Sequence, residues 1–176
     1  MPRAEAGIEV TWRAYELRPD PVPTLDPDGE YLRRVWASSV YPLAASLGME
    51  IRLPPVQPRS RLAHEAAYWA RSQGGFDDYN AAVFRAFFEN GADIGKEDVL
   101  VALASELGLD GESLGRALAA REFQRAVLED ERDARFAGVN GVPAFIANRR
   151  VLLSGVQPVE TLRAFVAQAR QRENED

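Results

Sequence analysis

A proline stands directly before a short apolar run in the C-terminal part of the chain, in the stretch GVPAFIA at residues 141–147. Proline has no backbone N–H to donate to a sheet ladder, so it occupies the first residue of a strand, a bulge or an edge. The apolar runs 144–147 and 150–153 are separated only by Asn148 and Arg149, which predicts a tight hairpin. The chain must therefore adopt a fold that places a proline at the mouth of a hairpin.

The remaining elements can be predicted from hydrophobic periodicity. Residues 7–17 alternate apolar and polar side chains, which predicts a strand that ends at the proline-rich run 18–23. Residues 32–47 have apolar side chains at helical spacing, with Pro42 inside the pattern, where we expect the helix to kink or end. Five further helical patterns fill residues 61–137, and a last helix follows the hairpin with Pro158 in its first turn. The predicted order is strand, helices, hairpin, helix, and the class is α/β.

Composition excludes several functions. Among 176 residues, 46% are hydrophobic and 27% charged, as in an ordinary globular domain. The net charge of −6 argues against a nucleic-acid partner, because a phosphate backbone requires a basic surface. No run of 18 apolar residues is present, so we expect no membrane span. The first ten residues lack the apolar core of a signal peptide, which makes the cytoplasm the expected compartment.

The chain has no cysteine and one histidine. It therefore has no disulfide, no thiolate zinc site and no cysteine nucleophile of its own. We expect no metal site. The acidic run at 129–133, which alternates with Arg132 and Arg135, is most simply interpreted as a solvated helix face.

Several segments together resemble the DsbA-like thioredoxin-fold family, in its FrnE-type branch. This branch is related to the 2-hydroxychromene-2-carboxylate isomerases and the kappa-class glutathione transferases. The segments are VTWRAYELRPD (10–20), LAHEAAYWA (62–70), AVFRAFF (82–88), GADIGKEDVLVALASELGLD (91–110) and GVNGVPAFIANRRVLLSGVQP (138–158). The resemblance implies an α/β thioredoxin-like fold, N-terminally incomplete, with an all-helical insertion. The thioredoxin-like part would comprise residues 1–60 and 138–176, and the insertion residues 61–137.

The resemblance also implies a binding site. Pro143 would follow a cis peptide bond beside the active site, and the backbone of Val142 would pair with an extended peptide or with glutathione by strand addition. The alternative for these two residues is a tight turn without a binding role. Ser60 and His64, at the start of the first inserted helix, would lie behind the site. A histidine of the helix surface or core remains the simpler interpretation of His64, and Arg59 replaces the asparagine usual in the family.

The family's reactive group lies on an N-terminal strand and helix that this sequence does not contain. It is a Cys-x-x-Cys pair in the oxidoreductases and a serine in the isomerases and kappa transferases, placed where the helix N-terminus stabilises a thiolate. The absent strand would lie between residues 8–17 and 144–147, so its omission would expose two ladder edges. We expect a gene model that begins too late. If the chain is made as 176 residues, we expect marginal stability or association through those edges, for example as a homodimer.

Three functions follow as expectations. The first is the body of a DsbA-like thiol–disulfide oxidoreductase that lacks its active-site cysteines, so that enzyme activity of this chain stays open. The alternative is a glutathione-dependent isomerase or transferase of the 2-hydroxychromene-2-carboxylate isomerase branch, with glutathione as the one candidate cofactor. The third is a non-catalytic module that binds extended peptides. The ending FIANRRVLLSGVQP at 145–158 favours the FrnE-type oxidoreductases over the isomerases.

Overall fold

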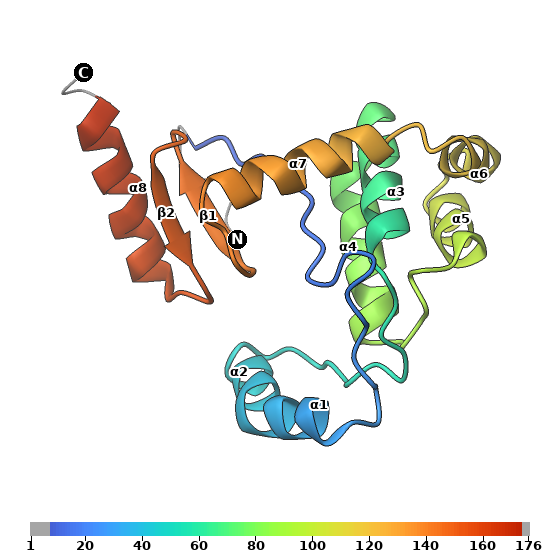
Figure 1. The fold of residues 1–176 in the computed structure, drawn as a ribbon, viewed down its shortest axis with the longest axis horizontal. Coiled ribbons are helices and arrows are strands. Elements are labelled where there is room, and N and C mark those ends of the chain that lie inside the picture. The colour runs from blue at the N-terminus through green and yellow to red at the C-terminus, as the bar shows by residue number, and fades with distance from the viewer. Residues whose placement is uncertain (1–7, 174–176) are drawn as a thin grey trace. The chain divides into compact units, whose positions relative to one another are not determined.

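A computed structural model describes residues 8–173 of the chain (Figure 1). The described residues form two compact units, one made of the residues up to Leu17 and from Leu128 onward, the other of Arg18–Val127. The division falls inside one helix, α7 (Gln124–Phe136). Residues 18–60, which we expected in the thioredoxin-like part, group with the helices by contact. The expected domain bounds at residues 60 and 137 stay a prediction.

The unit Arg18–Val127 is built around four helices in the region where the sequence predicted successive helices from residue 61 onward. They are α3 (Arg61–Ser72), α4 (Phe76–Phe88), α5 (Glu97–Glu106) and α6 (Gly111–Ala119). Their inward stripes form one cluster that includes Trp69, Tyr79, Leu100 and Leu114, all almost fully buried. Of the aromatic side chains of α4, Tyr79 belongs to this core, whereas Phe84 is 52% exposed.

Two polar contacts fix these helices. Asp110 is the N-cap of α6, and its side chain accepts a hydrogen bond from the Ser113 backbone N–H. The buried Tyr79 hydroxyl donates to the Leu100 carbonyl oxygen at 2.9 Å. Burial raises the pKa of the Tyr79 phenol above its usual value, so the group remains a neutral donor.

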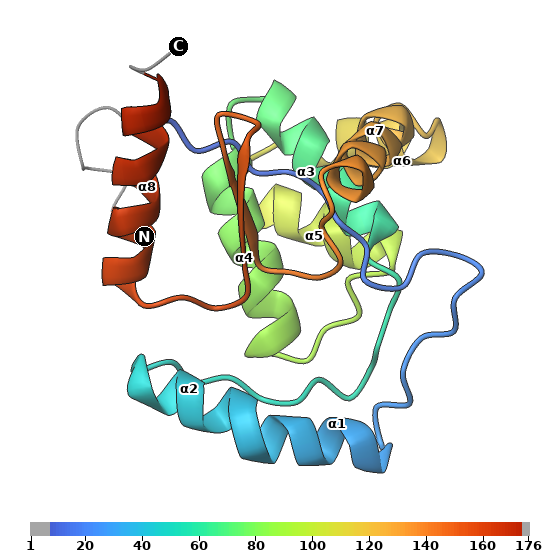
Figure 2. The same cartoon turned by 60° about the vertical axis from the view of Figure 1, so that its left-hand side comes forward.

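The residues with helical spacing at 32–47 form one continuous helical run (Figure 2), and a π-helical segment lies in its middle. It comprises α1 (Glu30–Val35), the π-helical segment η1 (Trp36–Val40) and α2 (Tyr41–Ser46). Pro42 was expected to kink or end the helix, but it lies in the first turn of α2. The π segment precedes it, with the Tyr41 N–H donating to the Trp36 carbonyl five residues back. We infer that the wider π-helical turn lets the helical run continue past Pro42, which has no backbone N–H to donate to the preceding turn.

The other unit contains the predicted hairpin and last helix. Strands β1 (Ala144–Ala147) and β2 (Val151–Ser154) pair antiparallel, with Phe145 opposite Leu153. Helix α8 (Val159–Glu173) lies beside the hairpin (Figure 1) and contacts β1. The second strand begins one residue later than expected, because Asn148 and Arg149 both adopt positive φ in the turn and Arg150 N–H closes it on the Ala147 carbonyl.

The expected strand at residues 7–17 does not form in the described part of the chain. Residues 8–17 form no strand. The only sheet among the described residues is the two-stranded β1–β2 sheet. Residue 7 lies outside the described residues. A strand exists only when a neighbour completes its ladder of hydrogen bonds, and an alternating side-chain pattern does not supply that neighbour. The prediction of a strand here was wrong for this structure.

Candidate functional site

The outer edge of β1 is the most prominent binding feature of the hairpin unit. The Gly155 N–H donates to the Pro143 carbonyl oxygen at 2.8 Å, which continues the β1–β2 ladder back to the proline. In an antiparallel pair, hydrogen-bonded and non-hydrogen-bonded pairs alternate along the strands. The main-chain groups of Ala144 and Ile146 therefore point to the other edge of β1. No third strand pairs with this edge among residues 8–173.

The segment Asn140–Pro143, here called the Val142 loop, leads into that edge. The Val142–Pro143 peptide bond is cis, and a second cis bond joins Asp20 to Pro21. The Val142 side chain is 47% exposed, and open space surrounds the position where Gly141 would carry a Cβ. The main chain of Val142 forms no hydrogen bond within the described residues. The loop thus presents accessible peptide groups in line with the free edge of β1.

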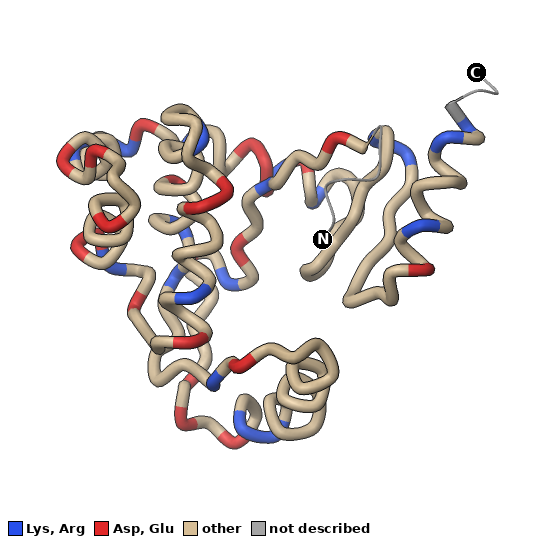
Figure 3. The backbone as a smooth tube through the Cα atoms, turned by 180° about the vertical axis from the view of Figure 1, so that it is seen from behind, with Lys and Arg blue, Asp and Glu red and all other residues tan. Residues whose placement is uncertain are grey.

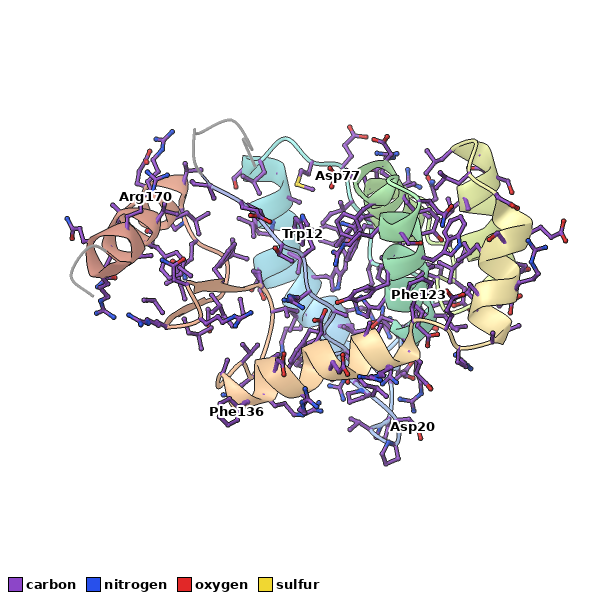
Figure 4. All side chains as sticks on the ribbon, turned by 90° about the horizontal axis from the view of Figure 1, so that it is seen from above. Trp12, Asp20, Asp77, Phe123, Phe136 and Arg170 are labelled. Atoms are coloured by element: carbon purple, nitrogen blue, oxygen red, sulfur yellow. The ribbon has the colours of Figure 1, made fainter. Side chains whose placement is uncertain are left out.

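The side chains beside this edge are apolar. Neither strand of the hairpin carries a charged residue, so the hairpin strands are tan in Figure 3. Ile146 and its register partner Leu152 are 44% and 38% exposed. Phe136, at the end of α7, is almost fully exposed and directed away from the helix (Figure 4). A partner strand at this edge would therefore meet apolar side chains rather than charges.

The extended segment at residues 8–17 is fixed by α7 rather than by a sheet. The carboxylate of Asp130 accepts from the Ala14 backbone N–H and from the Arg13 guanidinium, each at 2.8 Å. The Tyr15 hydroxyl donates to the Val139 carbonyl oxygen at 3.4 Å. Residues 14–16 are buried or half-buried, whereas Ile8, Val10 and Trp12 are exposed. The second half of the segment is therefore held by the rest of this unit.

Asp130 and Glu131 were expected on a solvated helix face, and that prediction was wrong. Both are almost fully buried, at 4% and 3% exposure. Glu131 pairs with Arg135 one turn further on the same helix. Their helical spacing could have predicted this burial. They lie three and four residues after the fully buried Val127 and therefore share its face of α7.

Ser60 and His64 lie in the other unit, at the start of α3, and Val142 and Pro143 lie in the hairpin unit. Ser60 precedes the helix, and its carbonyl oxygen accepts the His64 backbone N–H at 3.0 Å, while no side-chain cap is formed. His64 is half-buried and has other interactions. Whether these two residues serve the same site as Val142 stays a prediction.

Arg59, which precedes Ser60, has a structural role. Its guanidinium donates to the carbonyl oxygens of Arg18 and Val22, at 3.0 and 3.1 Å, and pairs with Asp20 at 3.2 Å. These contacts hold the turn that contains the cis Asp20–Pro21 bond. Arg59, which replaces the asparagine usual in the family, therefore binds other residues of its own chain.

The described residues contain neither a metal-binding cluster nor a membrane-length helix. No group of three or more His, Cys, Asp or Glu side chains is placed to hold a metal ion in residues 8–173. None of the helices in that range has the length and apolar character of a membrane-crossing segment. The chain contains no thiol. An edge such as that of β1 carries the main-chain groups that strand addition uses.

Comparison with known proteins identifies the family. Residues 2–167 match the family model described as the DSBA-like thioredoxin domain. The chain is 38% identical over 149 residues to the uncharacterized protein YwbO of Bacillus subtilis, covering 82% of this chain and 74% of that protein.

The structure also resembles the crystal structure of a probable DsbA oxidoreductase from Streptomyces coelicolor. The TM-score is 0.75 and the identity 26%, over 94% of this chain and 76% of the other. The fold is accordingly the helix-rich, DsbA-like variant of the α/β thioredoxin fold, as expected. The chain belongs to the DSBA-like thioredoxin domain family.

Proposed function

We propose that this chain is the peptide-binding body of a DsbA-like thiol–disulfide oxidoreductase of the FrnE-type branch. In this proposal Val142 and Pro143 receive an extended polypeptide, which adds to the outer edge of β1 as a new strand. The observation that carries the proposal is the edge of β1 that no strand of the described residues pairs, continuous with the exposed Val142, whose main chain forms no hydrogen bond among those residues.

Strand addition suits a substrate that is defined by its backbone rather than by its sequence. Each main-chain hydrogen bond contributes roughly 0.5–1.5 kcal/mol net, whatever the side chain. Side chains at alternate positions then modulate affinity against the local surface. Here that surface includes Val142 and Ile146, which favours unfolded segments with apolar residues at every second position. Unfolded polypeptides of this kind are the substrates expected of a protein disulfide oxidoreductase.

The proposal predicts that N-methylation of a bound peptide will weaken binding with a period of two. A methyl group on a backbone nitrogen removes one donor, and only every second residue of a strand donates toward a given edge. We expect loss of binding at alternate positions and near-normal binding between them, measured by fluorescence polarisation on a six-residue apolar peptide.

The control is the same peptide with its N-methyl groups moved by one residue. Equal loss at every position, or no loss at any, would contradict strand addition. Saturable binding of glutathione with no affinity for extended peptides would instead favour the isomerase and transferase branch. Peptide binding by a full-length protein that has no reactive thiol or serine would favour a non-catalytic module.

A second prediction concerns the chemistry. The 176-residue chain should catalyse no thiol–disulfide exchange, because exchange begins with attack by a thiolate and the chain has no cysteine. Insulin reduction and reactivation of scrambled ribonuclease should both proceed at the uncatalysed rate. Catalysis of exchange by the pure chain would contradict the proposal that this chain only binds the polypeptide and supplies no reactive group.

A further inference from the structure

Asp130 is a buried carboxylate that the proposed function does not use. Its side chain is 3% exposed, and both of its oxygens are engaged, one by the Arg13 guanidinium and the other by the Ala14 backbone N–H. Charge-assisted hydrogen bonds of this length are about twice as strong as neutral ones. A single side chain of α7 thus fixes both the position and the direction of the segment that carries Tyr15.

Tyr15 connects this segment to the Val142 loop. Its hydroxyl donates to the carbonyl oxygen of Val139, and the Val139 N–H donates to the Ala134 carbonyl of α7 at 2.9 Å. Val139 is buried, and both its N–H and its carbonyl oxygen are hydrogen-bonded. The other end of the loop is held by the hydrogen bond from Gly155 to the Pro143 carbonyl.

We propose that Asp130 and Tyr15 are positioning residues that fix the Val142 loop in its binding conformation. The inference rests on the proposed function, because it concerns affinity for an extended peptide. Neither residue contacts the peptide. Asp130 holds residues 13–14, Tyr15 follows them and holds Val139, and Val139 sets where the loop begins.

The physical reason is preorganisation. A loop that is already ordered loses less conformational entropy when a strand pairs with it, so its affinity is higher for the same contacts. Between Val139 and Pro143 only three residues remain, and one of them is Gly141, which adds no side-chain restraint. The restraint on this loop comes from its ends. Loosening the Val139 end should therefore weaken binding although no peptide contact is removed.

The test compares peptide affinity in variants that retain the shape of the side chain. Asp130→Asn keeps the size but loses the charge that pairs with Arg13 and places an N–H₂ group opposite one of the two donors. We expect the dissociation constant for the apolar peptide to rise about tenfold. Tyr15→Phe removes only the hydroxyl of a long hydrogen bond, and we expect a rise of about twofold to threefold. Arg13→Gln, which leaves the bond to Ala14 intact, should fall between these two.

The matched control is Val127→Ala, on the same helix and fully buried, but grouped with the unit Arg18–Val127 rather than with Asp130. It should lower the melting temperature and leave the dissociation constant unchanged at a temperature where all variants are folded. Hydrogen exchange of the Val139 amide, which donates to the Ala134 carbonyl in the free protein, should accelerate in Asp130→Asn and not in Val127→Ala.

The outcomes separate the two proposals. If the wild-type chain binds no extended peptide, the proposed function fails and this inference falls with it. If the wild type binds and Asp130→Asn binds equally well, or if the amide exchange of Val139 is unchanged, the inference alone is overturned. Weaker binding by Asp130→Asn with faster exchange supports it.

Discussion

Replacing Leu100 with alanine should lower the free energy of unfolding by about 2–5 kcal/mol, the largest effect that we expect from a single substitution in this chain. Leu100 is fully buried in the cluster formed by α3, α4, α5 and α6. Truncation removes apolar area from the core and leaves a cavity, because helices held on several sides relax only partly. Urea unfolding followed by circular dichroism at 222 nm would measure the change.

Leu107→Ala provides the matched control for this prediction. Leu107 is the C-cap of the same helix and is 37% exposed, so the same truncation there should cost well under about 2 kcal/mol. Equal losses for the two variants would contradict the placement of Leu100 in the core.

Gly111→Ala should destabilise the protein by about 1–3 kcal/mol, against the usual preference of a helix for alanine over glycine. Gly111 begins α6 where this helix approaches α5 closely. A Cβ at this position would collide with the Ser105 hydroxyl and lie 3.0 Å from the Val101 carbonyl oxygen. The main chain of α5 cannot move aside without disturbing its own hydrogen bonds, so the collision outweighs the helix preference.

Gly115→Ala, one turn later on α6, should have the opposite sign. A Cβ there would meet its nearest neighbours at 3.6 and 3.7 Å, which is ordinary contact distance. The helix preference is then unopposed, and we expect stabilisation of about 0.5–1 kcal/mol. Thermal unfolding of both variants would measure the two changes in stability. Changes of the same sign would show that α5 and α6 do not approach as described.

The helices could be predicted from the sequence because their signals are local. Apolar side chains recur with the helical period from residue 61 onward, and glycines such as Gly74 and Gly108 end the stripes with positive φ. Asp110 identifies the start of α6 without reference to any other element. The hairpin is local in the same sense, since two apolar runs and a two-residue turn determine it.

The candidate site was only partly accessible from sequence. Val142 and Pro143 were identified from a motif, and the structure places them at the free edge of β1. Asp130 was misinterpreted because its neighbours in the chain are charged, and charge in a run predicts exposure on average. Its burial depends on residues 13–14, more than a hundred positions away, which supply the donors that make a buried carboxylate tolerable.

The sequence alone determined the order of the helical regions, the hairpin and the absence of any thiol within these 176 residues. Tertiary structure decided the rest. It determined that residues 8–17 remain without a ladder, that Pro42 is accommodated by the π segment before it, and that Asp130 lies inside. The physical reason is common to all three. Periodicity and turn residues act over a few neighbouring positions, whereas strand pairing, helix accommodation and the burial of a charge depend on which distant groups supply the hydrogen bonds.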